Sequence, residues 1–236
     1  MEELQGVKEG EGGLEIGALT TISDLLANRR IETDFPILYQ AAAAMASPEI
    51  RNRATVGGNI CQASPAGDML TALTGVEATV VILGKGGEEK EVSIHQFIKG
   101  PGWTMLADEK GAILVKVRIG YPSLPASGFK KLGRRKAMVI AVVSAGASLI
   151  KNGDTVEKCI LSLGAVGPKP IRPFQAEEYM VAGPISKERI HKTSLLAVQA
   201  TSPISDLRAG ENYRRATIRV LVERLLSELC FDERGC

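Results

Sequence analysis

The chain has 236 residues, 44% of them hydrophobic and 24% charged, values that are ordinary for a globular protein of one large or two small domains. Its formal net charge of +2 and its aromatic content of 4% argue against binding to nucleic acid or to an anionic membrane. No apolar run is long enough to cross a bilayer, and the acidic, glycine-rich start MEELQGVKEGEGG differs from a secretion signal, so we expect a cytoplasmic protein.

The first half of the sequence is predicted to mix short strands with short helices. An amphipathic segment over residues 34–47 is expected to form a helix that Asp34 caps and in which Pro36 suits the first turn. The other expected elements are a strand at 14–16, a helix capped by Thr20 or Thr21, a strand over 75–83, and a short strand, helical turn and Gly-Pro-Gly loop over 91–106.

A strand over residues 111–120 is expected to close the first half. Its alternating apolar residues are predicted to share one side of the strand: Ile113, Val115, Val117 and Ile119. The segment YPSLPASG that follows is the best linker candidate, and we place a domain boundary there, near residues 122–127. The predicted domains are therefore 1–124 and 125–236.

The second half is expected to have strands first and helices last. Two long strands flank the turn Asn152-Gly153-Asp154, which is a hairpin signal. A long helix is predicted near the C-terminus, with one apolar face made of Ile218, Leu221, Val222, Leu225 and Leu229. Without a regular alternation of strand and helix, this half is predicted to be α+β.

The motifs of several common enzyme classes are missing from the sequence. The four cysteines form no CxxC pair, so no zinc site or iron–sulfur cluster is predicted on this chain. There is neither a GxxxxGK[ST] phosphate loop nor a GxGxxG motif after a strand. The chain has two histidines, which argues against a Ser-His-Asp site and against a histidine-based metal site. We therefore predict no metal site and no catalytic side chain.

Residues 53–69, RATVGGNICQASPAGDM, put two adjacent glycines, an asparagine and an aspartate into one short run. Successive backbone N–H groups freed of side chains can bind a diphosphate, with Thr55 and Asn59 adding side-chain donors and Asp68 accepting from a ligand hydroxyl. The alternative is a tight turn between a helix and a strand, in which Asp68 only caps the next helix. Residue chemistry alone favours this alternative, because short glycine motifs are permissive.

The basic run FKKLGRRK, residues 129–136, also has more than one interpretation. It is either a cradle for an anionic ligand, a nucleic-acid patch, or a solvated loop whose long side chains cover apolar surface. Without interleaved aromatic residues the nucleic-acid interpretation is the weakest, and residue chemistry favours the solvated loop.

Several stretches together resemble the FAD-binding medium subunit of the molybdenum-containing hydroxylases, the family of xanthine dehydrogenase and aerobic carbon monoxide dehydrogenase. The resemblance implies an α+β fold: a flavin-binding domain of the vanillyl-alcohol-oxidase type, then a smaller domain of antiparallel strands and helices. The matching stretches are LEIGALTTISDL, SPEIRNRATVGGNICQASPAGDML, FIKGPGWTMLADEKGAIL, GFKKLGRRKAMVIAVVSAGASL, LGAVGPKPIRP and ISDLRAGENYRRATIRVLVERLL.

The resemblance also implies which residues contact FAD. It places the ATVGGN segment at the diphosphate, Asp68 beside the ribityl–diphosphate portion, and Lys130 near the flavin ring system. It leaves Arg134 and Arg135 in structural or interfacial roles. The complete implied set of FAD contacts is Thr55, Gly57, Gly58, Asn59, Gln62, Asp68, Ile113, Leu114 and Lys130.

The function implied by the resemblance is that of an oxidoreductase subunit. FAD would collect electrons from iron–sulfur clusters on a small partner subunit and deliver them to NAD or another acceptor, while a large partner subunit carries molybdopterin. Relatives have a further glycine-rich phosphate loop upstream of LEIGALTT, and this chain begins only a few residues before that match. We therefore expect an N-terminally shortened flavoprotein subunit, with a non-catalytic docking subunit that binds no FAD alone as the alternative.

Overall fold

The described part of the chain folds into two larger antiparallel sheets and a small two-stranded one, with helices packed between and beside the larger two. A computed structural model describes residues 4–10, 12–120, 124, 126–135 and 138–231. The elements before residue 121 are β1 (Val7–Gly10), β2 (Gly13–Gly17), α1 (Ile22–Ala27), α2 (Arg29–Asp34), α3 (Pro36–Ala44), α4 (Pro48–Arg51), α5 (Val56–Gln62), α6 (Asp68–Thr74), β3 (Thr79–Leu83), β4 (Glu89–Ser93), α7 (Ile94–Phe97), β5 (Ile98–Gly100), β6 (Trp103–Thr104), the 3-10 turn Met105–Ala107 and β7 (Ile113–Gly120). The later elements are β8 (Ser127–Leu132), β9 (Val143–Asn152), β10 (Thr155–Gly164), α8 (Phe174–Val181), α9 (Lys187–Gln199) and α10 (Glu211–Phe231).

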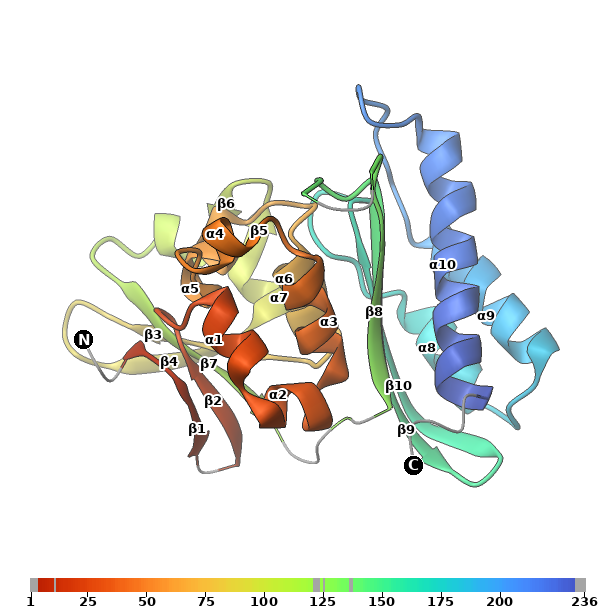
Figure 1. The fold of residues 1–236 in the computed structure, drawn as a ribbon, viewed down its shortest axis with the longest axis horizontal. Coiled ribbons are helices and arrows are strands. Elements are labelled where there is room, and N and C mark those ends of the chain that lie inside the picture. The colour runs from red at the N-terminus through yellow and green to blue at the C-terminus, as the bar shows by residue number, and fades with distance from the viewer. Residues whose placement is uncertain (1–3, 11, 121–123, 125, 136–137, 232–236) are drawn as a thin grey trace.

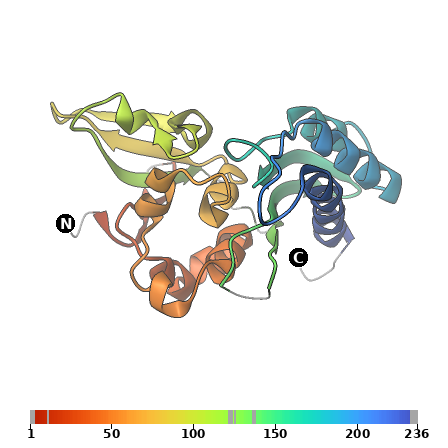
Figure 2. The same cartoon turned by 90° about the horizontal axis from the view of Figure 1, so that it is seen from above.

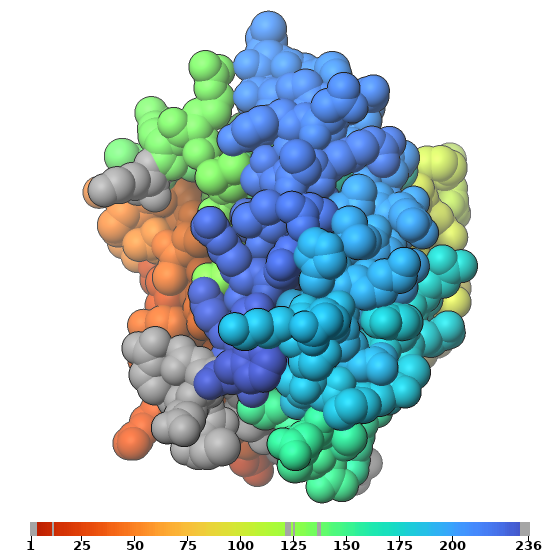
Figure 3. Space-filling model, turned by 90° about the vertical axis from the view of Figure 1, so that its right-hand side faces the viewer, coloured from red at the N-terminus to blue at the C-terminus, as the bar shows by residue number. Residues whose placement is uncertain are grey.

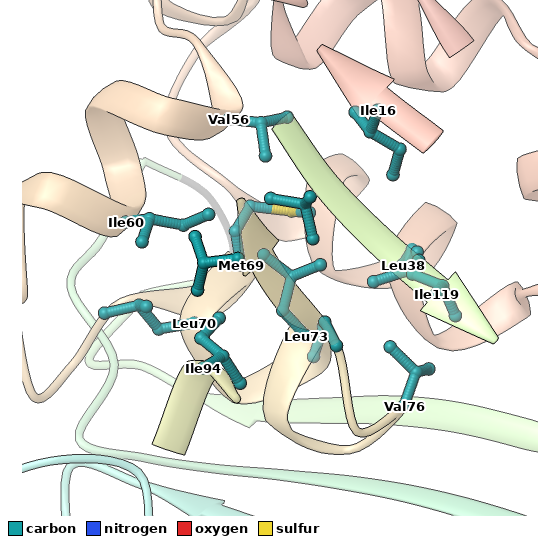
Figure 4. Packing of buried hydrophobic residues seen from close by; sticks show 14 of the residues in the cluster. Ile16, Leu38, Val56, Ile60, Met69, Leu70, Leu73, Val76, Ile94 and Ile119 are labelled. Atoms are coloured by element: carbon teal, nitrogen blue, oxygen red, sulfur yellow. The ribbon is translucent and has the colours of Figure 1, made fainter. Parts of the chain in front are cut away.

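The larger sheet has five strands in the order β1-β2-β7-β3-β4, each antiparallel to its neighbour. Apolar side chains of this sheet, α3, α5 and α6 form one continuous core. Figure 4 shows α6 at its centre, where Leu70 and Leu73 lie near Val56 and Ile60 of α5 and Ile119 of β7. Every residue of α6 is buried, so packing holds the whole helix in place, including its first residue, Asp68.

The smaller sheet, in the order β10-β9-β8, lies between two layers of helices. Helices α3 and α6 contact one of its faces, and α8 and α10 contact the other. Figure 1 and Figure 2 show this arrangement from two directions, and Figure 3 shows α9 and α10 covering the outer side. The second core cluster fills the space between the sheet and α8–α10.

The main predictions for the second half are confirmed. Strands β9 and β10 pair across the predicted hairpin turn, and Gly153 has a φ of +54°, which a side chain rarely adopts. Helix α10 buries the predicted apolar residues Ile218, Leu221, Val222 and Leu225, with Leu229 half-buried. Strands precede helices here, as the sequence predicts.

The predicted helix over residues 34–47 begins differently from the expectation. Asn28 caps a separate helix, α2, by accepting hydrogen bonds from the backbone N–H groups of Arg30 and Ile31. Asp34 is the last residue of α2, so it does not cap α3, whose N-cap is Phe35. Pro36 does occupy the first turn of α3, because a missing N–H costs nothing there.

The predicted alternation along the 111–120 strand is wrong at its start. Opposite Val81 and Ile82 the register shifts, so that Val115 is an extra residue in β7. As a result Leu114 is 7% exposed and Val117 is buried, while the side chain of Ile113 is 50% exposed.

The predicted linker and boundary fall mostly outside the described residues, since residues 121–123 and 125 are not among them. The division into domains 1–124 and 125–236 stays a prediction. Among the helices that the structure describes, none is both long and apolar enough to cross a bilayer.

Candidate functional site

The ATVGGN segment forms the start of a short helix and not a free turn. Thr55 is the N-cap of α5, with extended backbone and its hydroxyl accepting a hydrogen bond from the Gly58 N–H at 3.0 Å. The expectation of a tight turn is therefore corrected: the two glycines lie inside the first turn of a seven-residue helix.

Four of the predicted FAD contacts share one face of this helix. Thr55, Gly58, Asn59 and Gln62 are spaced i, i+3, i+4, i+7, and all four are exposed or partly exposed. The opposite face is buried in the first core, through Val56 and Ile60 among others. The sequence thus builds a helix with one side fixed in the protein and one side open to a ligand.

A side chain is excluded at Gly57 and at Gly58 for different structural reasons. The Gly57 N–H donates to the carbonyl oxygen of Ala18 at 2.8 Å, and a Cβ added to Gly57 would lie 2.8 Å from both that oxygen and the Ala18 Cβ. Gly58 is exposed, and a Cβ there would lie 2.9 Å from the Thr55 hydroxyl that caps the helix. The first glycine therefore permits close packing, and the second leaves the cap and the open face unobstructed.

Replacing Gly57 with alanine is expected to lower the free energy of unfolding by about 2 kcal/mol, because the new Cβ overpacks a backbone contact that cannot yield without moving α5. Chemical denaturation of the two proteins measures this difference. Gly100→Ala is the matched control, since a Cβ at Gly100 would meet no atom within 4 Å. Equal losses in the two variants would contradict the packing role of Gly57.

A cleft of about 430 Å³ lies beside α5, where the two halves of the chain meet. Its polar side chains include Asn59 of α5, Asp68 at the start of α6 and Lys131 of β8. Apolar side chains line another part, and three of them, Ile50, Met138 and Ile140, are more than half exposed at 54%, 57% and 61%. A pocket with both polar and apolar walls suits a ligand that combines a polyol with an aromatic ring.

Asp68 and Lys131 form a buried ion pair in this cleft. The Lys131 ammonium donates to Asp68 Oδ2 at 2.5 Å, and the two side chains are 8% and 6% exposed. Burial raises the pKa of Asp68 to about 6, and the neighbouring Lys131 charge opposes that rise. A carboxylate buried to this extent destabilises the folded chain unless hydrogen-bond donors contact it.

Two oxygen atoms of the cleft residues lack hydrogen-bond partners: Asn59 Oδ1 and Asp68 Oδ1. Buried oxygens of this kind are rare in folded proteins, and each costs about 1–3 kcal/mol when nothing donates to it. Both atoms accept hydrogen bonds, so they favour a ligand with hydroxyl groups at this point.

Asn59 and Asp68 line the cleft, and the other predicted contacts lie outside its lining. Ile113 is exposed at the start of β7, which contacts α5, whereas Leu114 is turned into the core. Lys130 pairs with Glu228 of α10 at 2.8 Å, on the other face of β8 from Lys131. The structure therefore brings Asn59 and Asp68 together and does not bring Leu114 or Lys130 to them.

Lys131 is the site residue that sequence reasoning missed. Adjacent residues of a strand point to opposite faces, so only one of Lys130 and Lys131 can face α3 and α6. The sequence does not reveal which of them does. A buried Asp68 needs a nearby cation, however, and this basic run is a segment that could supply one. No group of three or more His, Cys, Asp or Glu suited to a metal ion occurs among the described residues.

Comparisons with known proteins match both parts of the chain. Residues 1–122 match the FAD binding domain in molybdopterin dehydrogenase, and residues 127–229 match the CO dehydrogenase flavoprotein C-terminal domain. The chain is 29% identical to the glyceraldehyde dehydrogenase medium chain of Sulfolobus acidocaldarius, over 97% of this chain and 80% of the relative. It is 29% identical to the xanthine dehydrogenase FAD-binding subunit of Escherichia coli O157:H7, over 97% of this chain and 78% of the relative.

A solved structure agrees with these sequence matches. Carbon monoxide dehydrogenase from Hydrogenophaga pseudoflava, solved without the Mo-pyranopterin moiety of its molybdenum cofactor, superimposes with a TM-score of 0.90 at 28% identity, covering 96% of this chain and 78% of that one. The fold expected from the sequence, a flavin-binding part followed by an α+β part, is confirmed. The chain belongs to the family of FAD-binding medium subunits of the molybdenum hydroxylases.

Proposed function

We propose that this chain holds the FAD through which a molybdenum hydroxylase passes electrons, from iron–sulfur clusters on a small partner subunit to NAD or another acceptor. A large partner subunit carries the molybdopterin in this proposal. FAD supplies the two-electron redox chemistry when bound, and the chain supplies its position and surroundings. The observation that carries the proposal is the family match over both halves, together with partnerless acceptor oxygens in the cleft beside α5.

The proposed FAD contacts on α5 are Thr55, Gly57, Gly58, Asn59 and Gln62. The open face of the helix supports Thr55, Gly58, Asn59 and Gln62, whereas Gly57 acts by letting the helix pack closely. In this arrangement the side chains bind and orient FAD, and none has to transfer a proton.

The proposed contacts away from α5 are Asp68, Ile113, Leu114 and Lys130. Asp68 is supported by its free oxygen in the cleft, and Ile113 by its exposure at the start of β7, a strand that contacts α5. Leu114 and Lys130 rest on the family resemblance. We also keep the division into domains 1–124 and 125–236 as part of the proposal.

The first experiment is an absorption spectrum of the purified chain before and after addition of FAD, alone and together with candidate partner subunits. Flavin bands that persist through gel filtration, in either preparation, are the expected result. A chain that stays colourless in both preparations overturns the proposal and favours a docking role without flavin.

Replacing Asn59 with alanine is expected to weaken FAD binding about three- to tenfold, because one polar contact in the cleft is lost. Fluorescence titration with FAD gives the dissociation constant. Asn212→Ala, on the exposed part of α10, is the control and should match the wild type. An unchanged constant in Asn59→Ala removes this residue from the binding site.

A further inference from the structure

Lys131 connects three elements that lie far apart in the sequence. It belongs to β8, and its ammonium donates to Asp68 Oδ2 at 2.5 Å and to the backbone oxygen of Ala44, the last residue of α3, at 3.1 Å. A cation at the C-terminal end of a helix is favourable, so the second contact helps to fix the ammonium in place. The fixed ammonium in turn fixes the orientation of the Asp68 carboxylate.

The pairing uses one oxygen of Asp68 and leaves the other free. Oδ2 is held by Lys131, while Oδ1 is buried with no partner. Among the described residues, the charged side chains that line the cleft are Asp68, Lys131 and Arg135, and of these only Lys131 forms an ion pair with Asp68. Lys131 is therefore the group that favours the ionised form of this buried carboxyl.

We propose that Lys131 is a positioning residue for the flavin: it holds Asp68 as an ionised, oriented acceptor for a hydroxyl group of the bound FAD. The proposal rests on the proposed function, because it assumes that FAD is the ligand of the cleft. A hydrogen bond to an ionised acceptor is roughly twice as strong as one between neutral groups, which gives Lys131 an effect on binding without touching the ligand. Since Lys131 follows residue 125, flavin binding then depends on both halves of the chain.

The test is a set of FAD titrations on Lys131→Met, Asp68→Asn and the double variant, in the preparation that binds FAD as wild type. Lys131→Met is expected to weaken binding about tenfold or more. In the Asp68→Asn background the same change is expected to have an effect of less than about threefold, because Lys131 acts through Asp68. An equal factor in the two backgrounds, or no effect in either, overturns the proposal.

The pH profile separates positioning from a general structural role. Wild-type affinity is expected to fall as pH decreases through about 6, where Asp68 takes up a proton. In Lys131→Met the fall is expected at a higher pH, because burial is then no longer opposed by a nearby cation. A structural role alone would weaken binding equally at every pH. Lys151→Met is the matched control, since Lys151 donates to the backbone oxygen of Leu229 at 3.0 Å, away from the cleft.

A measurement without FAD separates this proposal from the proposed function. The ionisation of Asp68 is followed by the infrared carboxyl band that disappears in Asp68→Asn, in wild type and in Lys131→Met, with Lys131→Gln in its place if the methionine variant does not fold. A midpoint that rises in the Lys131 variant supports the inference, and an unchanged midpoint overturns it. If no preparation binds FAD, the proposed function fails, while this titration still decides whether Lys131 holds the carboxylate.

Discussion

Replacing Arg214 with leucine is expected to lower the free energy of unfolding by about 3–5 kcal/mol, because two carbonyl oxygens and Asp206 each lose a charged donor, a loss of about 1–3 kcal/mol per group. The Arg214 side chain lies in the first turn of α10 and is 2% exposed. Its guanidinium donates to the carbonyl oxygens of Val142 and Ala165 at 2.5 Å and 3.0 Å, and it pairs with Asp206 at 2.7 Å. Leucine fills much of the volume but removes this donor from the two carbonyl oxygens, whereas Asp206 still accepts from Arg208 and Ala209.

The same substitution is expected to weaken FAD retention, because Arg214 also supports a strained loop. Ala165 has a φ of +60°, which is costly for a residue with a side chain. Its N–H donates to the carbonyl oxygen of Pro65 at 2.8 Å, three residues before Asp68, and its own carbonyl oxygen accepts from Arg214. Loss of Arg214 removes one of the contacts that hold this loop against the residues leading into α6.

Urea denaturation measures the loss of stability, and the control is Arg219→Leu on the same helix. Arg219 is 34% exposed and pairs with Glu223 one turn along α10, an interaction worth about 0.3–0.5 kcal/mol. The two variants carry the same chemical change and differ in burial. If Arg214→Leu were no less stable than Arg219→Leu, the buried network would have no role in stability.

The fold could be predicted from the sequence wherever local signals agree with burial. The hairpin at Gly153 and the apolar face of α10 are of this kind, since turn chemistry and a helical period fix them locally. The start of β7 was not predictable, because the bulge at Val115 depends on how β7 pairs with β3. The prediction that Asp34 caps α3 is wrong for a different reason. Asn28 caps the preceding helix α2, and Asp34 is the last residue of that helix.

The candidate site was predictable in part. The family resemblance selected the segment from Thr55 to Asp68, and the structure gives a physical reason for Gly57 and for Gly58. Which lysine faces the cleft depends on the face of β8 that packs on α3, and this tertiary contact is not encoded by any local pattern. The neighbouring lysines of this strand therefore have different environments, Lys130 beside α10 and Lys131 beside Asp68.

Replacing Asp68 with asparagine is expected to abolish a pH dependence of stability worth about 3 kcal/mol. Burial raises the pKa of Asp68 from 3.8 to about 6, so between these values the folded chain binds more protons than the unfolded chain. Stability contributed by this group is therefore complete only well below pH 3.8, falls as the pH rises, and is lost above about 6. A shift of about two pKa units corresponds to about 3 kcal/mol.

The measurement is the free energy of unfolding of wild type and Asp68→Asn from pH 4 to pH 7, without FAD. Other carboxyl groups titrate equally in both proteins, so the wild-type value minus the variant value isolates Asp68 and should fall by about 2 kcal/mol across this range, the rest of the change lying below pH 4. A constant difference would show that Asp68 ionises in the folded chain as it does in the unfolded chain. With saturating FAD the fall should become smaller, because a hydroxyl that donates to Asp68 stabilises the carboxylate and lowers its pKa. Burying the ionised Asp68 without a ligand lowers the stability of the folded chain, and a ligand hydroxyl that donates to Asp68 offsets this loss.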